Sequence, residues 1–341
     1  MSDAKRREGP GAGQSALAAV LRAPEWTLLL AILVVMGGIY LKQGPPYSFF
    51  QAPNRANLAH GIALLGVLAV GAAVIIIAGG IDLSVGSVVA LSAVFAGKLM
   101  TEWLPGAEKS GGPISPLTIG SAIVLTLLLG AAIGLLHALF ITAFRLPPFI
   151  ATLATMAGLR SLAIVLSKNQ SVNVNFPGFR MFGNDNNYTV PIFLTVVVVV
   201  SVMMGATVLG RHLYALGGNE AAARLSGLPV GRLKATAYGL SGMLSALGGL
   251  LFAGNSGQGK GTMGVSYELF AITAAVVGGC SLAGGVGTIR GTVMGLILIQ
   301  VVIKGTGLVV TSIDPTQIEG LVLGTIIVLA VAFNQKFRGR G

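Results

Sequence analysis

Few residues in this chain have the types and spacing that catalytic chemistry requires. The three histidines, His60, His137 and His212, lie far apart, and none has the neighbours of a zinc site. No Gly-x-x-x-x-Gly-Lys-Ser/Thr loop is present to hold nucleotide phosphates. The single cysteine, Cys280, permits neither an intrachain disulfide nor a cysteine metal cluster. We therefore expect no catalytic residue, metal or cofactor, and a partner subunit or an ion gradient must supply any energy that is used.

The polar segment 210–234 contains the clearest local signal. Asn219 is a favourable N-cap, Glu220 stands at the positive end of the helix dipole, and Gly227 can end a helix. Glu220 and Arg224 are spaced i,i+4, which stabilises a helix slightly. The pattern predicts a helix about 10 Å long, and a helix this short needs a partner surface to be stable.

Two interpretations of this short helix remain open. It could lie on the membrane with its arginine residues near the headgroups, or it could dock into a groove on a cytosolic motor subunit and transmit movement to the spans. The residues predicted to form this coupling site are Gly218, Asn219, Glu220, Ala221, Ala222, Arg224, Ser226 and Gly227.

Four polar residues beside or within apolar runs are candidates for a translocation path. Asp82 either caps the next helix or lines a polar path, and the two roles are compatible. Arg160 falls inside an apolar run, where it must reach outward or face a polar cavity. Ser84 and Glu268 complete the set. The sequence shows no cluster of aromatic rings and carboxylates that would bind a polar small molecule, so we expect selectivity to lie mainly in another protein.

Glycine-rich stretches recur at two places. The runs 79–86 and 278–285 both read Gly-Gly-x-(Asp/Ser)-Leu-(Ser/Ala)-x-Gly, and each separates two apolar runs, which favours an internal duplication. Gly130 with Gly134 has the spacing of close helix packing, as has Gly287 with Gly291 and Gly295. These sets pack either within the chain or at a homodimer seam.

Composition defines the fold class. The chain has 341 residues, of which 54% are hydrophobic and only 10% charged, whereas soluble domains are about 25% charged. A span takes about 20 apolar residues, so the chain has room for about ten. We predict an all-α, polytopic helical membrane protein in a lipid bilayer.

Ten apolar runs are candidate spans, of which the third and eighth are short, so eight full spans with two re-entrant pieces is an alternative. The runs are Trp26–Leu41, Leu58–Ala78, Val85–Met100, Leu117–Phe144, Phe149–Leu166, Val190–Leu209, Ala235–Ala253, Leu269–Leu282, Thr288–Val310 and Ile318–Phe333.

The distribution of Lys and Arg predicts the orientation. More of these cations fall in segments on the same side as the N-terminus, which places both termini in the cytoplasm. The predicted organisation is a cytoplasmic tail 1–24, a transmembrane domain 25–335 and a cytoplasmic tail 336–341. Within the domain, 210–234 is cytoplasmic and the loops 101–116 and 167–189 are external. The same asymmetry explains the net charge of +11, so we expect no nucleic-acid partner.

Several of these motifs together resemble one family. The run Ala215–Gly227, the two glycine motifs, Tyr267-Glu268-Leu269 and Phe149–Leu153 are similar to the ribose-type sugar permeases of bacterial ATP-binding-cassette (ABC) importers. The resemblance covers about 54–333. It implies a multi-pass protein of the bacterial cytoplasmic (inner) membrane that moves a ribose-like pentose or a hexose inward.

The resemblance also implies partners. These are two ABC ATPase subunits, which bind ATP and Mg, a second permease chain that is identical or a related paralogue, and a sugar-binding protein outside the membrane. The coupling loop of the family falls on Asn219 to Gly227 here. The chain departs from the family pattern at Phe270 and Val286, where acidic and polar or basic residues are usual, so ribose itself is not implied. The alternative from another class is an ion-coupled secondary transporter, which would require several mid-span carboxylates.

Overall fold

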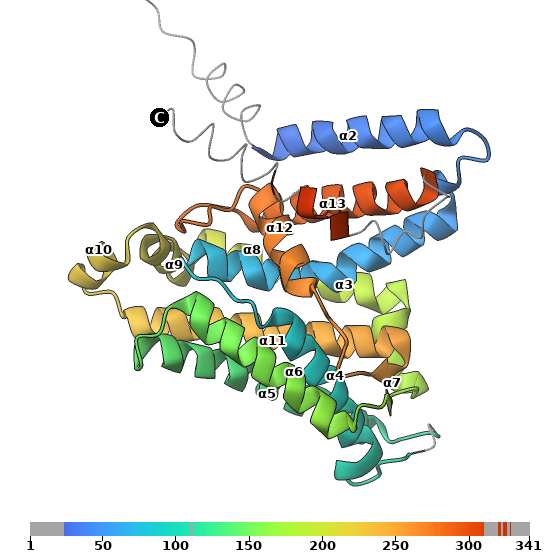
Figure 1. Ribbon diagram of the computed structural model, residues 1–341, viewed down its shortest axis with the longest axis horizontal. Coiled ribbons are helices and arrows are strands. Elements are labelled where there is room, and N and C mark those ends of the chain that lie inside the picture. The colour runs from blue at the N-terminus through green and yellow to red at the C-terminus, as the bar shows by residue number, and fades with distance from the viewer. Residues whose placement is uncertain (1–23, 110–111, 310–319, 322, 326–327, 329–341) are drawn as a thin grey trace, which may run out of the picture.

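Helices form nearly all the regular structure of the part of the chain that the computed structural model describes, which is residues 24–109, 112–309, 320–321, 323–325 and 328 (Figure 1). Two two-residue strands, β1 (Val172–Asn173) and β2 (Gln258–Gly259), pair antiparallel. Eight helices in these ranges are long and apolar enough to cross a bilayer. The predicted all-α polytopic fold is confirmed. Nearly all of the tail 1–24, most of the tenth candidate span and the tail 336–341 lie outside the described residues.

The long helices follow the predicted apolar runs closely. They are α2 (Pro24–Gln43), α3 (Ala52–Ile77), α4 (Val85–Lys98) with the π-helical turn η2 (Leu99–Trp103), α5 (Pro116–Thr142), α6 (Pro148–Ser167), α8 (Asn186–Ala206), α11 (Val230–Ser256) and α13 (Ile289–Val309). The shorter helices are η1 (Ser48–Phe50), α7 (Pro177–Asn184), α9 (Val208–Gly218), α10 (Glu220–Leu225) and α12 (Tyr267–Val277).

The two short candidate spans differ in the structure. The third continues through η2 to 19 residues, which is enough for a span, so a re-entrant piece there is wrong. The eighth forms α12, which has 11 residues. At 1.5 Å per residue this helix is about 16 Å long, roughly half of the hydrocarbon thickness. The re-entrant alternative therefore fits the eighth candidate alone.

Burial separates central helices from peripheral ones. The apolar windows of α3, α4 and α11 are 72–83% buried, whereas those of α2, α5, α6 and α8 are 17–33% buried. The peripheral helices expose large apolar side chains, such as Leu33 at 57% and Val199 at 60%. Such an apolar belt is stable only against lipid. In Figure 1, α11 passes through the middle of the molecule, with α5 and α6 on one side and α2 and α13 on the other.

The small-residue sets pack inside the chain. A Cβ added at Gly130 would meet the backbone of Gly242 on α11, and one at Gly134 would lie 2.8 Å from the Cα of Gly239. Gly291 and Gly295 approach the backbone at the end of α12 in the same way. Close backbone contact between these helices needs residues without side chains. Of the two predicted alternatives, the intramolecular contact is the one the structure contains.

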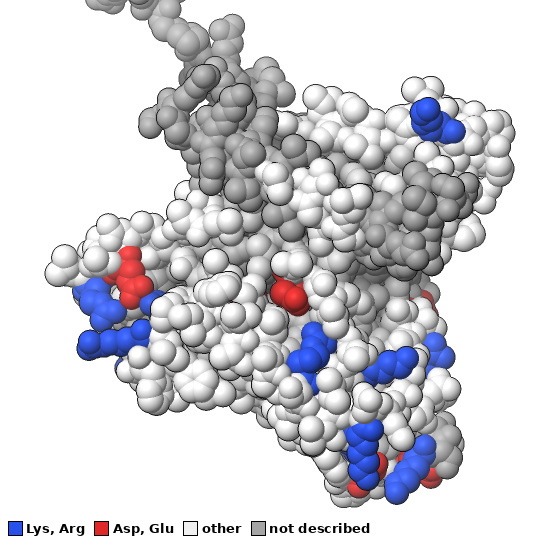
Figure 2. All heavy atoms as spheres, in the orientation of Figure 1, with Lys and Arg blue, Asp and Glu red and all other residues white. Residues whose placement is uncertain are grey.

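The extramembrane segments lie at opposite ends of the bundle. Helices α9 and α10 extend from one end, and α7 and the segment after η2 lie at the other (Figure 1). On the face in Figure 2, Lys, Arg, Asp and Glu gather mainly toward these two ends, and the surface between them is mostly uncharged. This is the charge distribution of a protein that crosses a bilayer from end to end.

Candidate coupling helix and translocation path

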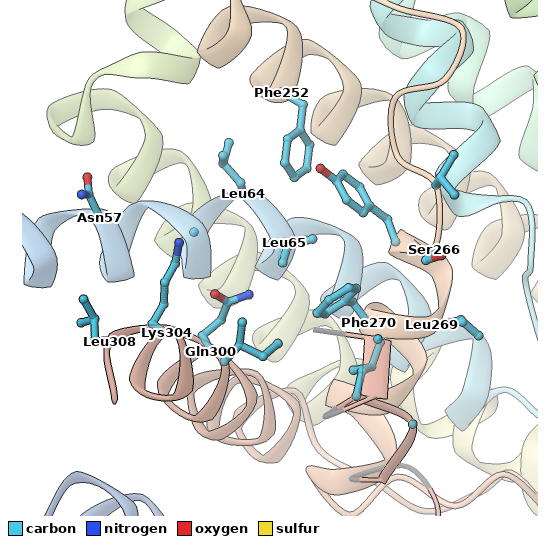
Figure 3. Close-up of a pocket in the computed structure, with 18 of the residues that line it drawn as sticks. Asn57, Leu64, Leu65, Phe252, Ser266, Leu269, Phe270, Gln300, Lys304 and Leu308 are labelled. Atoms are coloured by element: carbon cyan, nitrogen blue, oxygen red, sulfur yellow. The ribbon is translucent and has the colours of Figure 1, made fainter. Parts of the chain in front are cut away.

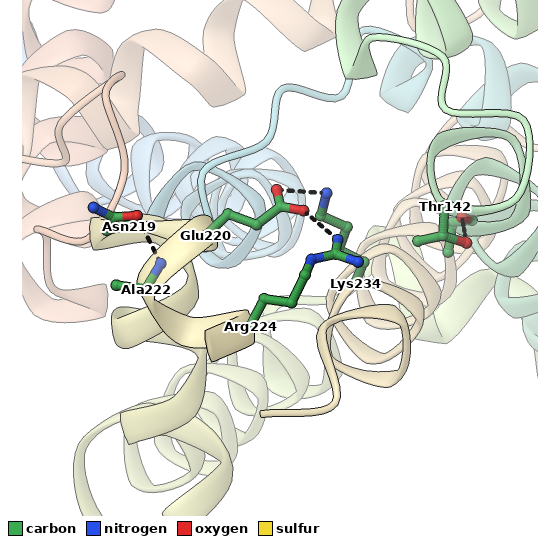
Figure 4. A network of polar contacts seen from close by, with 7 residues as sticks. Thr142, Asn219, Glu220, Ala222, Arg224 and Lys234 are labelled. Carbon is green, nitrogen blue, oxygen red and sulfur yellow. Dashed lines mark hydrogen bonds and ion pairs between the residues drawn. The ribbon is translucent and has the colours of Figure 1, made fainter. Parts of the chain in front are cut away.

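Helix α10 has the ends that the sequence predicts. The Asn219 side chain accepts a hydrogen bond from the backbone nitrogen of Ala222 at 2.9 Å, and Gly227 follows the helix with φ of +79°. Glu220 pairs with Arg224 at 3.1 Å and, through its other carboxylate oxygen, with Lys234 at 2.8 Å (Figure 4). The Lys234 contact connects α10 to the start of α11, and the sequence pattern did not reveal it.

The electrostatics of Glu220 make this connection sensitive to acid. Burial alone would raise its pKa, but hydrogen bonds and charge from Lys234 and Arg224 outweigh burial and lower the pKa below its ordinary value. A lowered pKa in the folded state stabilises the fold above the unfolded pKa of about 4.3. That contribution is lost as pH falls through the folded pKa.

We therefore expect α10 to loosen in acid before the spans do. Hydrogen-exchange protection of the α10 amides, corrected for intrinsic rates, should fall as pH is lowered below about 4.3. Glu220→Gln should show reduced protection already at neutral pH and no further loss over this range. Equal acid sensitivity in the Gln variant would contradict the role of this carboxylate.

Helix α10 presents one large apolar side chain to solvent. Leu225 is 90% exposed, whereas Ala223, two residues earlier, is 5% exposed and faces the protein. A single exposed leucine is ordinary on a protein surface, but a helix this short needs a partner surface to be stable, which makes Leu225 the candidate docking contact of α10.

The predicted path residues Asp82 and Ser84 lie together inside the bundle. Asp82 is 3% exposed, and its Oδ1 accepts hydrogen bonds from the backbone nitrogen of Ser84 at 2.9 Å and from the Ser84 hydroxyl at 2.6 Å. Its Oδ2 accepts from the Ser241 hydroxyl on α11 at 3.1 Å. Asp82 therefore binds the turn before α4 and ties it to α11.

Arg160 and Glu268 belong to the same region. The Arg160 guanidinium, on α6, donates to the carbonyl oxygens of Gly261, Met263 and Gly264 in the segment that leads into α12. Glu268 interacts electrostatically with Arg160 and Asp82, and its Oε2 atom lies against Gly86 in the first turn of α4. The four predicted path residues, which are far apart in the sequence, thus lie together near the start of α4.

Two of the three histidines make hydrogen bonds inside the bundle. His60 contacts the amide oxygens of Asn186 at 2.7 Å and Asn255 at 3.2 Å, which joins α3, α8 and α11. His137 contacts the Thr155 hydroxyl at 2.7 Å. No group of three or more His, Cys, Asp or Glu suited to a metal occurs within the described ranges.

The two glycine motifs meet each other and the end of α9. The amide of Gly285 donates to the carbonyl of Ile77 at 2.9 Å, so the loops after α3 and α12 are joined directly. Gly217 lies against this bond, since a Cβ there would be 2.7 Å from the Gly285 nitrogen. Tyr214 on α9 adds a hydrogen bond to the Gly287 carbonyl at 2.8 Å. The segment that leads into α10 is therefore held by both glycine loops.

A cavity lies between α3, α13 and the start of α12, at the end of the bundle away from α10. Its volume is about 770 Å³, and none of the four predicted path residues lines it. Four aromatic rings border it, and the rings of Phe252 and Tyr267 are 4.6 Å apart. The sequence did not reveal this aromatic cluster, because Phe252 and Tyr267 are brought together by the tertiary packing.

Comparison with known proteins identifies the architecture. Residues 54–331 match the family described as the permease component of the branched-chain amino acid transport system. The chain belongs to this family. It is a multi-pass protein of the bacterial cytoplasmic membrane, and its named relatives are import permeases. The predicted localisation and the predicted family are therefore confirmed.

Curated members of the family align over most of their length. The chain is 38% identical to the ribose import permease protein of Bacillus subtilis, covering 85% of this chain and 87% of that protein. It is 34% identical to the ribose import permease protein of Escherichia coli K12, covering 90% and 92%. It is 33% identical to the galactose/methyl galactoside import permease protein of E. coli K12, covering 90% and 93%. No solved structure matches the chain.

Proposed function

We propose that this permease is the membrane-spanning subunit of an ABC importer that carries a monosaccharide, a ribose-like pentose or a hexose, into the cell. The observation that carries the proposal is the alignment of nearly the whole chain with import permeases for ribose and galactose. Transport proceeds by alternating access, and ATP hydrolysis in a partner drives it. Membership of a family of importer components supports this function over an ion-coupled transporter that works alone.

The proposed assembly has partners on both sides. Two ATPase subunits bind ATP and Mg and contact the permease domain through the cytoplasmic loop 210–234. A second permease chain, identical or a paralogue, completes the membrane part. A sugar-binding protein docks at 101–116 and 167–189, whose described residues lie at the end opposite α10. Both termini are cytoplasmic in this arrangement.

Two groups of residues have proposed roles in the transport cycle. The segment Asn219–Gly227, with Glu220 anchored to Lys234, couples the ATPase to the spans. Asp82, Ser84, Arg160 and Glu268 border the translocation path, where they hold α4, α6, α11 and α12 together. Movement of α10 reaches this region through the glycine loops that hold α9.

Uptake of labelled sugars tests the function. A strain lacking the chain should lose uptake of D-[¹⁴C]ribose or D-[¹⁴C]galactose, and the wild-type gene should restore it. Uptake of L-[¹⁴C]leucine should not change. Loss of leucine uptake with normal sugar uptake would instead favour an amino acid importer, as the family description would suggest.

Truncation of Leu225 tests the docking site. We expect Leu225→Ala to lower the amount of ATPase subunit that co-purifies with the tagged chain by about tenfold, because one buried leucine contributes about 1.5–3 kcal/mol. The matched control is Leu41→Ala, a leucine on α2 that is 82% exposed and lies outside the loop 210–234. Equal recovery of the ATPase with both variants would overturn the docking role of this side chain.

A further inference from the structure

The cavity between α3 and α13 has the dimensions of a small-molecule site. Its volume of about 770 Å³ lies within the 300–1,000 Å³ range of ligand pockets. Its lining is mainly apolar, with a few polar side chains from the first half of α3 and the second half of α13. A ligand coming from the side where the binding protein is proposed to dock would meet this cavity before the cluster around Asp82.

Gln300 is the most informative residue of the lining. It lies on the spanning helix α13, is 4% exposed, and makes no hydrogen bond to any residue that the structure describes. An amide at a cavity wall can use its donors and acceptors on a bound ligand. Gly61 on α3 leaves room for it, since a Cβ there would lie 3.3 Å from the Gln300 Oε1 atom. The amide is thus held at the cavity wall, with no hydrogen bond to another described residue.

Two further polar side chains, Asn57 and Lys304, line the cavity near Gln300 and are available to hydrogen-bond a ligand. Figure 3 shows Gln300 and Lys304 extending from successive turns of α13 toward α3, which carries Asn57. Neither Lys304 nor Asn57 makes a side-chain hydrogen bond or ion pair within the described ranges. Two amides provide both donors and acceptors, whereas the ammonium only donates.

Aromatic residues form the apolar part of the cavity wall. Phe252 and Tyr267 form a tilted pair at 4.6 Å, and Phe270 lies at the start of α12. Such rings accept the apolar C–H face of a sugar, and the amides and ammonium accept its hydroxyl edge. No carboxylate lines the cavity among the described residues, so the ammonium group of an amino acid would have no charged partner.

We propose that this cavity is a sugar-binding site on the translocation route, in which Gln300, Asn57 and Lys304 hydrogen-bond the hydroxyls of a neutral monosaccharide. The inference rests on the proposed function and adds substrate-contacting residues to it. The permease itself then contributes to selectivity, and the sugar passes this cavity before it reaches the region of Asp82.

Removal of the buried amide tests the site in cells. Gln300→Leu keeps the side-chain volume and loses the hydrogen bonds, so we expect sugar uptake to fall about tenfold with unchanged amounts of the chain in the membrane. The control is Thr306→Val on the same helix, because the Thr306 hydroxyl bonds its own helix at Val302 and does not line the cavity. This control should stay within twofold of wild type. Equal uptake by both variants would overturn the proposed site.

Cysteine protection tests occupancy without relying on transport. In a Cys280→Ser background, Asn57→Cys should react with a membrane-impermeant maleimide, and millimolar D-ribose or D-galactose should slow the reaction in the solubilised full-length chain. L-Leucine should have no effect. An unchanged rate with both sugars would overturn the site, and protection by L-leucine alone would overturn its specificity.

The two experiments separate this inference from the proposed function. If the strain lacking the chain takes up both sugars normally, sugar import by this protein is wrong. If the wild type transports sugar while Gln300→Leu does so equally well and Asn57→Cys is not protected, the importer stands and the cavity is not its binding site.

Discussion

Substitution of Gly217 by alanine is expected to abolish transport while the neighbouring substitution Gly218→Ala leaves it intact. A methyl group on Gly217 would lie 2.7 Å from the Gly285 nitrogen and closer still to the Ile77 carbonyl oxygen. These two groups form the hydrogen bond that joins the glycine loops. Because backbone surrounds the site, no flexible side chain can move aside, and the helix end itself has to shift. Overpacking of this kind costs about 1–3 kcal/mol or more.

The adjacent glycine provides a matched control for this prediction. A Cβ on Gly218 would meet no atom within 4 Å, although the two residues are consecutive at the end of α9. We expect Gly217→Ala to reduce uptake at least tenfold, and Gly218→Ala to remain within twofold. Uptake, thermal stability of the solubilised chain and recovery of the ATPase subunit should be measured together. Transport by Gly217→Ala at the level of Gly218→Ala would contradict the role of this junction in coupling.

Loss of the Asp82 carboxylate should be the second severe change. Asp82→Ala would leave the Ser84 amide and the Ser84 and Ser241 hydroxyls without their acceptor in a buried site, at a cost of about 1–3 kcal/mol for each unsatisfied group. We expect strongly reduced amounts of folded protein and transport below a tenth of wild type. Detergent-solubilised yield and sugar uptake measure the two effects.

The conservative variant Asp82→Asn separates the two roles predicted for this residue. An amide can keep the oxygen acceptor for Ser84, and its NH₂ group can donate to the Ser241 hydroxyl, which then acts as acceptor. If Asp82 acts by holding the turn against α11, Asn should restore both the folded protein and most of the uptake. Normal folding with lost uptake would show that the negative charge itself is needed along the path.

Local features of this protein followed from the sequence because their causes lie within a few residues. Long apolar runs must form helices in lipid, since the bilayer offers no partner for backbone groups, and the predicted runs match α2 to α13 closely. The ends of α10 were predictable because Asn219 and Gly227 act on their own helix. The extent of the third span was less certain, since η2 continues α4 through Thr101 and Glu102, which interrupt the apolar run.

Other features arise only when distant segments pack together. Lys234 reaches Glu220 across 14 residues, Ser241 reaches Asp82 across 159, and Arg160 reaches the segment before α12 across about a hundred. The choice between internal packing and a dimer seam for Gly130 and Gly134 was likewise decided by their contact with α11.

Contiguous residues were enough to predict the fold class, most of the spans, the ends of α10 and the family, because hydropathy, capping and motif identity are local properties. Only the tertiary structure decided which polar groups share a site. Asp82 lies within electrostatic range of Glu268 and outside the cavity, which Phe252, Tyr267 and Gln300 help to line. The physical reason is that helices in a bilayer associate through close packing of small residues. Which faces meet therefore depends on the shapes of helices that are distant in sequence.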